Sequence, residues 1–226
     1  MLLSKCWVLL RYCSYISDKR LVLHNCNFVL PVRIRIKKGC VLELKDGYFS
    51  KCVFSLKGVN NNAECQGAIS STTMVLDGYH NTVVLGQDVE VNQSRLIVRG
   101  KEGRCIIGDR THIGGVYAVC MGEDNSLEIG QDCMLADNID IWNSDTHAIW
   151  DKESSTVLNP SLPVRIGNHV WIGKNSVVLK GVSIGDGAIV GMNSIITKNV
   201  EPFSVVAGQN RILHTNVNWS NHYISE

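Results

Sequence analysis

The chain has 226 residues, of which 45% are hydrophobic and 19% are charged, and its formal net charge is +1. This composition can form a hydrophobic core without cross-links, so one globular domain is expected. The near-neutral charge argues against a dominant nucleic-acid surface. None of the nine cysteines lies in a Cys-x-x-Cys pair. We interpret them as reduced core thiols of a cytoplasmic protein, not as disulfides or metal ligands.

The chain begins with an apolar segment that carries Lys5 and Arg11. It is too short to cross a bilayer and no small-x-small cleavage site follows it, so neither an integral membrane span nor a signal peptide is expected. We predict that residues 1–20 form a cap over the open end of the domain. Association with a membrane surface is a minor alternative. Residues 21–70 alternate like strands, but the repeat register before residue 75 stays unassigned.

A six-residue repeat dominates the rest of the chain. From Ile166 to Ile196 an aliphatic residue recurs at every sixth position, with a small or medium-sized residue four places later. This period fits neither a helix nor an ordinary strand, and it predicts coils of three short strands. Earlier coils have extra residues after the third hexad, which should stack at one corner. Their hexads begin at 85, 91 and 97, at 107, 113 and 119, and at 129, 135 and 141.

A long loop, residues 143–163, is inserted at that corner. Loops of this length within a compact repeat commonly bind or cover a ligand. The loop carries His147 close to Asp145. Histidine is the natural general base at neutral pH, and a nearby carboxylate can fix its tautomer. The position of His147 makes it the candidate base, although by residue type alone a histidine in such a stretch is more often an ordinary loop residue.

Three runs of sequence resemble a known family: PVRIGNHVWIG at 163–173, GDGAIVG at 185–191 and SIITKNV at 194–200. They are similar to the hexapeptide-repeat acyltransferases, above all to the branch that contains galactoside acetyltransferase and the bacterial capsule and polysialic acid O-acetyltransferases. The resemblance implies an all-β, left-handed parallel β-helix with one extruded loop and a short N-terminal cap. We therefore predict a β-helix domain over residues 21–215, followed by a tail, residues 216–226.

The resemblance also implies acetyl transfer from acetyl-CoA to a sugar hydroxyl, in a capsular or other surface polysaccharide, by a homotrimer without a metal. His147 matches the catalytic histidine of the family, with Asp145 in support. Trp171, which follows 24 residues later, matches the tryptophan beside the thioester. Further acetyl-CoA contacts are implied for Gly173, Gly191, Met192, Thr197, Lys198 and Arg211. The candidates for the acceptor site are Tyr117, Trp142, Asn143 and Trp150. The two tryptophans are equally well explained as hydrophobic anchors of the loop.

Two departures from the family pattern bear on the site. Residues 115–117 read Gly-Val-Tyr where galactoside acetyltransferase has an asparagine that binds the sugar. The usual Gly-x-Pro-Ala ending is replaced by Gly-Gln-Asn-Arg at 208–211, which keeps the glycine and a cation but loses the proline. The cation, Arg211, is a candidate for the nucleotide phosphates. His169 and Lys180 are interpreted as ordinary surface residues.

Three alternatives remain open. An N-acetyltransferase of a nucleotide-linked amino sugar would share the donor and the base but use a nitrogen acceptor. A non-catalytic solenoid that binds partners would not bind acetyl-CoA at all. A β-helix carbonic anhydrase would need clustered zinc-binding histidines, and the seven histidines include no tight pair in the repeat.

Overall fold

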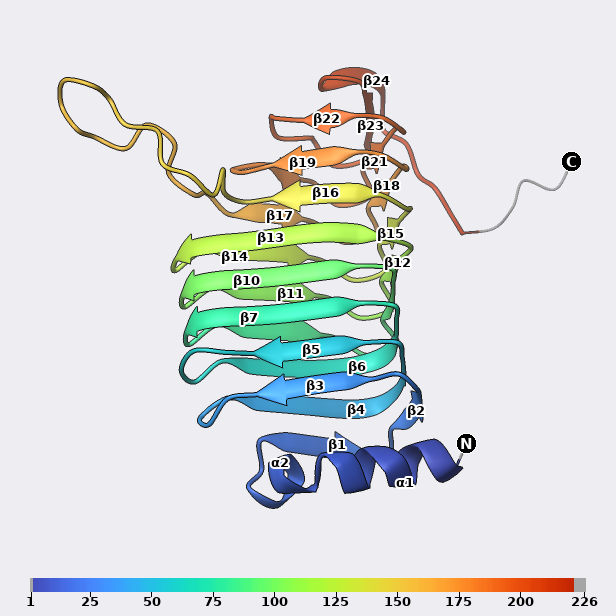
Figure 1. Cartoon of the computed structure of the whole chain (residues 1–226). Coiled ribbons are helices and arrows are strands. Elements are labelled where there is room, and N and C mark those ends of the chain that lie inside the picture. Colours follow the sequence, from blue (N-terminus) through green and yellow to red (C-terminus); the bar gives the residue numbers. More distant parts are fainter. Residues whose placement is uncertain (1, 222–226) are drawn as a thin grey trace, which may run out of the picture.

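Short parallel strands wind into a three-sided solenoid, with two helices across one end and a long loop projecting near the other (Figure 1). The computed structural model describes residues 2–221, with side chains from residue 6 onward. Strands of successive coils pair in parallel on each face. The fold is therefore the parallel β-solenoid that the six-residue repeat predicts.

The first face carries the aliphatic residues that open each repeat. Leu85, Ile107, Ile129 and Ile166 pair in register from coil to coil, and all four are buried. Parallel strands with one side in the core need an aliphatic residue at each inward position, which this column supplies. The strands of the face are β1 (Leu21–His24), β4 (Val41–Ser50), β6 (Asn62–Ser70), β8 (Thr82–Leu85), β11 (Arg104–Ile107), β14 (Ser126–Ile129), β17 (Val164–Ile166) and β20 (Ser183–Ile184).

The second face continues from the first because β4 and β6 bend around the corner between them. Val91, Ile113, Leu135, Ile172 and Val190 form its inward column. The antiparallel strand β24 (Arg211–Thr215) closes the open edge beside β23. The other strands of the face are β2 (Asn27–Val29), β9 (Glu90–Asn92), β12 (His112–Ile113), β15 (Met134–Leu135), β18 (Trp171–Ile172), β21 (Ile189–Val190) and β23 (Ser204–Ala207).

The third face is a separate sheet of eight strands. Its strands run side by side up the front of the solenoid (Figure 1). They are β3 (Arg33–Ile36), β5 (Val53–Leu56), β7 (Thr73–Tyr79), β10 (Arg95–Lys101), β13 (Val116–Glu123), β16 (Ile139–Trp142), β19 (Val177–Leu179) and β22 (Ile195–Ile196).

The predicted hexads are wrong by one residue on the third face of two coils. Ala118, not Val119, pairs with the inward Ile141, and Leu96, not Ile97, pairs with Ala118. The cause is a corner between the second and third faces that is one residue shorter in these coils than in the next. Ile97 and Val119 therefore lie on the outer side of the sheet, although they are only 4% and 2% exposed.

The extra residues of the early coils stack at the corner after the third face, as predicted. Gly78, Gly100 and Gly122 pair in register there, with φ values of +116°, +117° and +115°. A Cβ atom on Gly78 or Gly100 would lie 2.0 Å from the carbonyl oxygen of the next glycine, so only glycine fits. The long loop leaves the solenoid at the same corner, and its Ser161 packs over Gly122.

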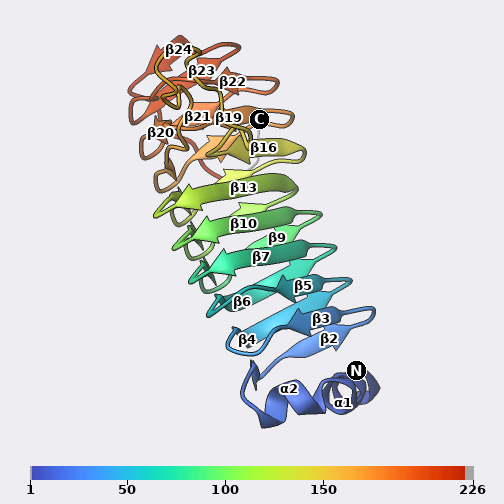
Figure 2. The ribbon, with the colours of Figure 1, turned by 60° about the vertical axis from the view of Figure 1, so that its left-hand side comes forward.

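The two helices, α1 (Leu2–Arg11) and α2 (Cys13–Ser17), lie across the first coil (Figure 2). Val8 and Tyr12 are buried against the coil. The Tyr12 hydroxyl donates to the carbonyl oxygen of Val32 and accepts a hydrogen bond from the N–H of Ile34, both at 3.1 Å. Neither these helices nor any other helix within residues 2–221 has the length and apolar character needed to cross a membrane.

Candidate active site

A small polar network holds the base of the long loop. Asp145 Oδ2 accepts hydrogen bonds from Lys180 Nζ at 2.5 Å and from Asn159 Nδ2 at 2.8 Å. The Asn159 amide also donates to the carbonyl oxygen of His147 at 2.9 Å, and its Oδ1 accepts from the N–H of Ile149 at 2.6 Å. Asn159 thus ties the outgoing arm of the loop to the returning arm, and Lys180 fastens both to the solenoid.

His147 stands on this network with its imidazole exposed. Within residues 2–221 the ring has no hydrogen-bond partner, so the expected support from the Asp145 carboxylate is absent. Asp145 is engaged instead by Lys180 and Asn159, whose hydrogen bonds lower the pKa of its carboxyl group. Asp145 therefore positions the loop backbone, and the imidazole is left available to a substrate.

Asn143 is a structural residue and does not face an acceptor, contrary to the sequence-based expectation. Its side chain is fully buried. Its Oδ1 accepts a hydrogen bond from the N–H of Met121 at 2.8 Å, and its Nδ2 donates to the carbonyl oxygen of Ser126 at 3.2 Å and to Cys120 Sγ at 3.3 Å. These bonds close the corner from which the loop departs.

Two of the other acceptor candidates lie together on the outer side of the third face. Tyr117 and Trp142 meet edge to face, with ring centroids 5.2 Å apart, and the Arg95 guanidinium lies 5.3 Å from the centre of the tyrosine ring. A groove of about 420 Å³ adjoins this cluster and includes Asp140. Trp150 lies apart from them, exposed on the loop. The cluster offers aromatic surface and charge of both signs.

Trp171 lies on β18 with 39% of its surface exposed, and the C-terminal segment covers part of it. The Trp219 ring is 5.9 Å from Trp171 and stacks on His169 at 4.1 Å with an interplanar angle of 4°. Trp219 Nε1 donates to the carbonyl oxygen of His169 at 2.9 Å, and His169 Nε2 lies 3.0 Å from the carbonyl oxygen of Trp219. Because that partner is a carbonyl, Nε2 must carry the proton. His169 is therefore an anchor for the tail.

The predicted donor contacts lie on the last coils. Gly173 and Gly191 stack at the corner after the second face, where a Cβ atom on Gly173 would approach the Met192 nitrogen to 2.7 Å. The Met192 side chain is 62% exposed. This corner therefore presents accessible backbone and one flexible apolar side chain.

Thr197 and Lys198 lie at the end of β22, where Asn210 organises them. Asn210 Oδ1 accepts hydrogen bonds from the N–H of Thr197 at 2.8 Å and from its hydroxyl at 3.1 Å. Asn210 Nδ2 donates to the carbonyl oxygen of Lys198 at 3.0 Å. The side chains of Lys198 and Arg211 are exposed. They provide two cations at the top of the solenoid that suit an anionic ligand.

The structure does not bring His147 and Trp171 together within one chain. The loop projects from the corner between the third and first faces, whereas β18 lies on the second face, on the far side of the solenoid (Figure 1). The residues that sequence reasoning missed are Asn159, Lys180 and Trp219. The Asn-Pro pair at 159–160 marks a turn, and a tryptophan in a polar tail suggests docking, but neither pattern reveals its partner.

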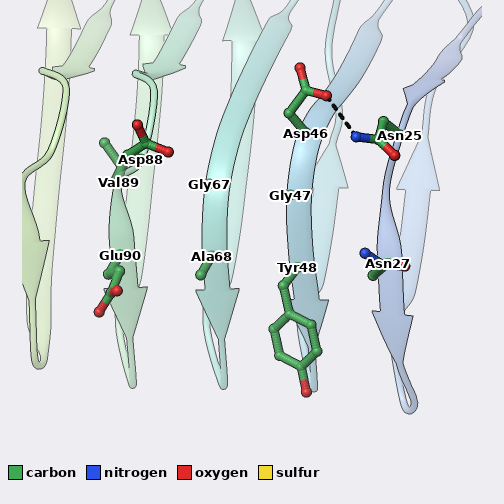
Figure 3. Close-up of a pocket in the computed structure, with 10 residues that line it drawn as sticks. All are labelled: Asn25, Asn27, Asp46, Gly47, Tyr48, Gly67, Ala68, Asp88, Val89 and Glu90. Carbon is green, nitrogen blue, oxygen red and sulfur yellow. Dashed lines mark hydrogen bonds between the residues drawn. The ribbon is translucent and has the colours of Figure 1, made fainter. Parts of the chain in front are cut away.

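A separate pocket of about 380 Å³ lies on the second face near the N-terminal end (Figure 3). Gly47 and Gly67 line the pocket together with Asp46 and Asp88, and Asn25 Nδ2 donates to Asp46 Oδ1 at 3.1 Å. Across residues 2–221, no group of three or more His, Cys, Asp or Glu side chains is placed to hold a metal ion. This pocket is remote from the loop and the last coils.

A family model matches part of the last coils. Residues 163–198 match the hexapeptide repeat of succinyl-transferase. The matched segment contains Trp171 and the donor candidates from Gly173 to Lys198.

The curated relatives are acetyltransferases, and three of them are named for a polysaccharide or a galactoside. Polysialic acid O-acetyltransferase of Neisseria meningitidis is 29% identical over 57% of this chain and 70% of that protein. Polysialic acid O-acetyltransferase of Escherichia coli O1:K1 / APEC is 36% identical over 55% of this chain and 40% of that protein. Galactoside O-acetyltransferase of E. coli K12 is 34% identical over 45% of this chain and 51% of that protein.

Two solved structures are similar over most of the chain. The polysialic-acid-specific acetyltransferase NeuO superposes with a TM-score of 0.68 at 25% identity, covering 91% of this chain and 84% of that one. The polysialic acid O-acetyltransferase OatWY superposes with a TM-score of 0.70 at 27% identity, covering 90% and 93%. Together the matches confirm the resemblance to the hexapeptide-repeat acetyltransferases, and they support acyl transfer as the class of reaction.

Proposed function

We propose that this protein transfers the acetyl group of acetyl-CoA to a sugar hydroxyl in a capsular or other surface polysaccharide. The observation that carries the proposal is the exposed His147, fixed on an anchored loop with its ring free to accept a proton. The named activity of the relatives, two of which act on polysialic acid, supports a polysaccharide acceptor. Acetyl-CoA is made inside the cell, so we place the reaction in the cytoplasm.

The proposed active site is shared between subunits of a homotrimer. His147 and Trp171 lie on opposite sides of one solenoid, so a single chain does not form a site from both. A loop that projects from its own solenoid can instead reach the second face of a neighbouring copy. A closed ring of three copies would form three equivalent sites of this kind.

The proposed donor surface runs over the last coils. Trp171 would contact the pantetheine arm near the thioester, because its exposed ring offers apolar area on a rigid strand. The backbone at Gly173 and Gly191 would allow close approach of that arm. Lys198 and Arg211, exposed at the top of the solenoid, would meet the phosphates.

In the proposed reaction His147 acts as general base. It removes the proton from the acceptor hydroxyl while the oxygen attacks the carbonyl carbon of the thioester. A C–O bond forms, the tetrahedral oxyanion collapses, and the C–S bond breaks. The imidazolium then returns its proton to the departing CoA thiolate. No covalent acyl-enzyme is needed.

The activity is tested by following CoA release from acetyl-CoA with three acceptors: polysialic acid, a neutral polysaccharide and a nucleotide-linked amino sugar. We expect turnover with a surface polysaccharide and none with the amino sugar. Turnover with the amino sugar alone, with the acetyl group on its nitrogen in the product, would establish N-acetylation instead. No acetyl-CoA binding would establish a non-catalytic solenoid.

The shared site is tested by mixing two inactive variants, His147→Ala and Trp171→Ala, and allowing their subunits to exchange. A Trp171→Ala chain still has an intact loop, and a His147→Ala chain still has an intact second face. An interface between that loop and that face contains both residues. Random mixing in a symmetric trimer should restore about a quarter of the wild-type activity. Equal size of both variants by ultracentrifugation is the control. Continued inactivity of mixed oligomers would contradict the shared site.

A further inference from the structure

The outer side of α1 is apolar and exposed. Leu10 is 77% exposed, Leu9 is 41% exposed and Trp7 is 37% exposed. Figure 1 shows the helix lying across the end of the solenoid, with all coils on one side of it. The other side of α1 therefore faces away from the protein.

Within residues 6–11 of α1, Val8 is the buried side chain, and Tyr12, four residues later and just after the helix, is also buried against the first coil. The terminal unit of a solenoid normally exposes a polar surface to water, because an apolar end would cause association with other molecules. The cap thus closes the core of the solenoid but leaves a second apolar surface to be covered.

Positive charge is concentrated at the same end of the molecule. Residues 1–57 contain 11 Lys and Arg but three Asp and Glu, a net charge of +8, although the whole chain is +1. Among these cations Arg11, Lys19, Lys37 and Lys38 are exposed. Arg20 joins the cap to this region, because its Nη1 donates to the carbonyl oxygen of Ile36 at 2.8 Å.

We propose that this capped end docks on an anionic lipid bilayer. The apolar side of α1, formed by Trp7, Leu9 and Leu10, lies in the headgroup region, and the surrounding cations contact acidic headgroups. An interfacial helix of this kind combines apolar burial with electrostatic attraction. The solenoid axis then stands away from the bilayer, with the loop and the last coils at its far end (Figure 1). The proposal is independent of the proposed acetyl transfer.

The positive charge and the exposed apolar residues together favour an anionic bilayer over an anionic polysaccharide or a second copy of the chain. An anionic polysaccharide would satisfy the cations but would leave Leu10 in water. A second copy docked cap to cap would cover the leucines but would bring two ends of charge +8 together. An anionic bilayer satisfies both features at once.

The test is co-sedimentation of the full chain with vesicles of phosphatidylcholine alone or mixed with an equal part of phosphatidylglycerol. We expect binding to the anionic vesicles only, and loss of binding as salt is raised. Leu9→Gln combined with Leu10→Gln should lower the partition coefficient at least about tenfold, because the apolar contact is removed. Lys37→Glu combined with Lys38→Glu should lower it by a similar factor.

The matched control is Ile212→Gln combined with Leu213→Gln, two exposed apolar residues on β24 at the opposite end, which should bind like wild type. Equal melting temperatures establish that all variants fold. Vesicles with brominated acyl chains should quench the fluorescence of wild type more than that of Trp7→Phe. Wild type that ignores anionic vesicles would overturn the proposal. Binding that needs the lysines but not the leucines would assign the end to an anionic polymer, and cap-dependent self-association without vesicles would assign it to a second copy.

Discussion

The residue most open to test is His147, because its ring is exposed and makes no contact that the fold needs. His147→Gln keeps a similar size but cannot act as a base. We expect kcat to fall by a factor of about 10²–10⁴, while the dissociation constant of acetyl-CoA and the melting temperature stay unchanged. Steady-state kinetics, calorimetric titration and a thermal melt measure the three quantities. Turnover above a few per cent would place the base elsewhere.

Asp145 and Lys180 are expected to control the position of that ring indirectly. Lys180→Met removes the hydrogen bond that contributes most to the lowered pKa of Asp145. That pKa should therefore rise toward its usual range. We expect kcat to fall without a change in donor affinity, because the base of the loop loosens. Lys174→Met is the matched control, since Lys174 lies 4.0 Å from Asp137 on an exposed flank. An equal effect of the two variants would contradict a specific anchor.

The same pair predicts a pH dependence of the loop. A carboxyl group with a lowered pKa in the folded protein stabilises it above the pKa of the unfolded chain, and the effect is lost as pH falls through the folded value. Protection of residues 145–159 from limited proteolysis should therefore fall in acid. In Lys180→Met the fall should begin at a higher pH. Coincident profiles would show that the ion pair is not what holds the loop.

For single residues, the chemical role was easier to predict from the sequence than the hydrogen-bond partners. His147 is predictable from the position of the loop in the repeat. Asn143 is not, because a polar residue beside a loop suggests a ligand, whereas here it satisfies buried backbone groups at a corner. The partner of Asp145 comes from residue 180, in the following coil, and no local pattern points to it.

Among the elements after residue 75, the first two faces of the solenoid were predictable and the corner before the third face was not. An inward aliphatic residue is required on every strand, so the six-residue period determines the first two faces. The length of a corner depends on local turn geometry, and one residue fewer shifts Ile97 and Val119 to the outer side. Burial alone hides this error, since neighbouring side chains cover both residues. Strand pairing reveals it.

The C-terminal segment is an element whose docking can be tested directly. Trp219→Ala removes the stack on His169 and the Nε1 hydrogen bond, so residues 216–221 should detach and Trp171 should become more exposed. Hydrogen exchange of the segment and acrylamide quenching of tryptophan fluorescence measure these changes. Trp219→Phe retains a ring without the N–H and should have an intermediate effect. Full protection in Trp219→Ala would mean that other contacts hold the tail.

For the whole molecule, the fold places three different surfaces on three parts of one solenoid. The cap carries positive charge and exposed apolar residues, the loop carries the candidate base, and the last coils carry the candidate donor contacts. The repeat specifies the scaffold between them, which is why the solenoid was predictable from the sequence. The repeat does not specify how copies would pair, so the meeting of the loop with the second face of a neighbouring copy stays a proposal.

The core of the solenoid should be sensitive to alkali, because it contains several buried thiols. Burial raises the pKa of Cys52, Cys120 and Cys133 to about 11 each, from 9.0. In the unfolded chain these thiols lose their protons near pH 9, whereas in the folded chain they keep them up to about pH 11. Between these values the unfolded state binds fewer protons, so the free energy of unfolding should fall by ~1.4 kcal/mol per pH unit for each thiol.

Urea unfolding measured at pH 7, 9 and 10.5 tests this expectation, with a reducing agent present throughout. Stability should change little up to pH 9 and then fall steeply. Cys120→Ala should reduce the slope of the free energy of unfolding against pH by the contribution of one thiol. The variant also loses stability at pH 7, because a buried side chain is removed. Cys13→Ala is the matched control, since Cys13 is exposed and should leave the slope unchanged. A slope that is the same in both variants would show that ionisation of the core thiols does not govern alkaline unfolding.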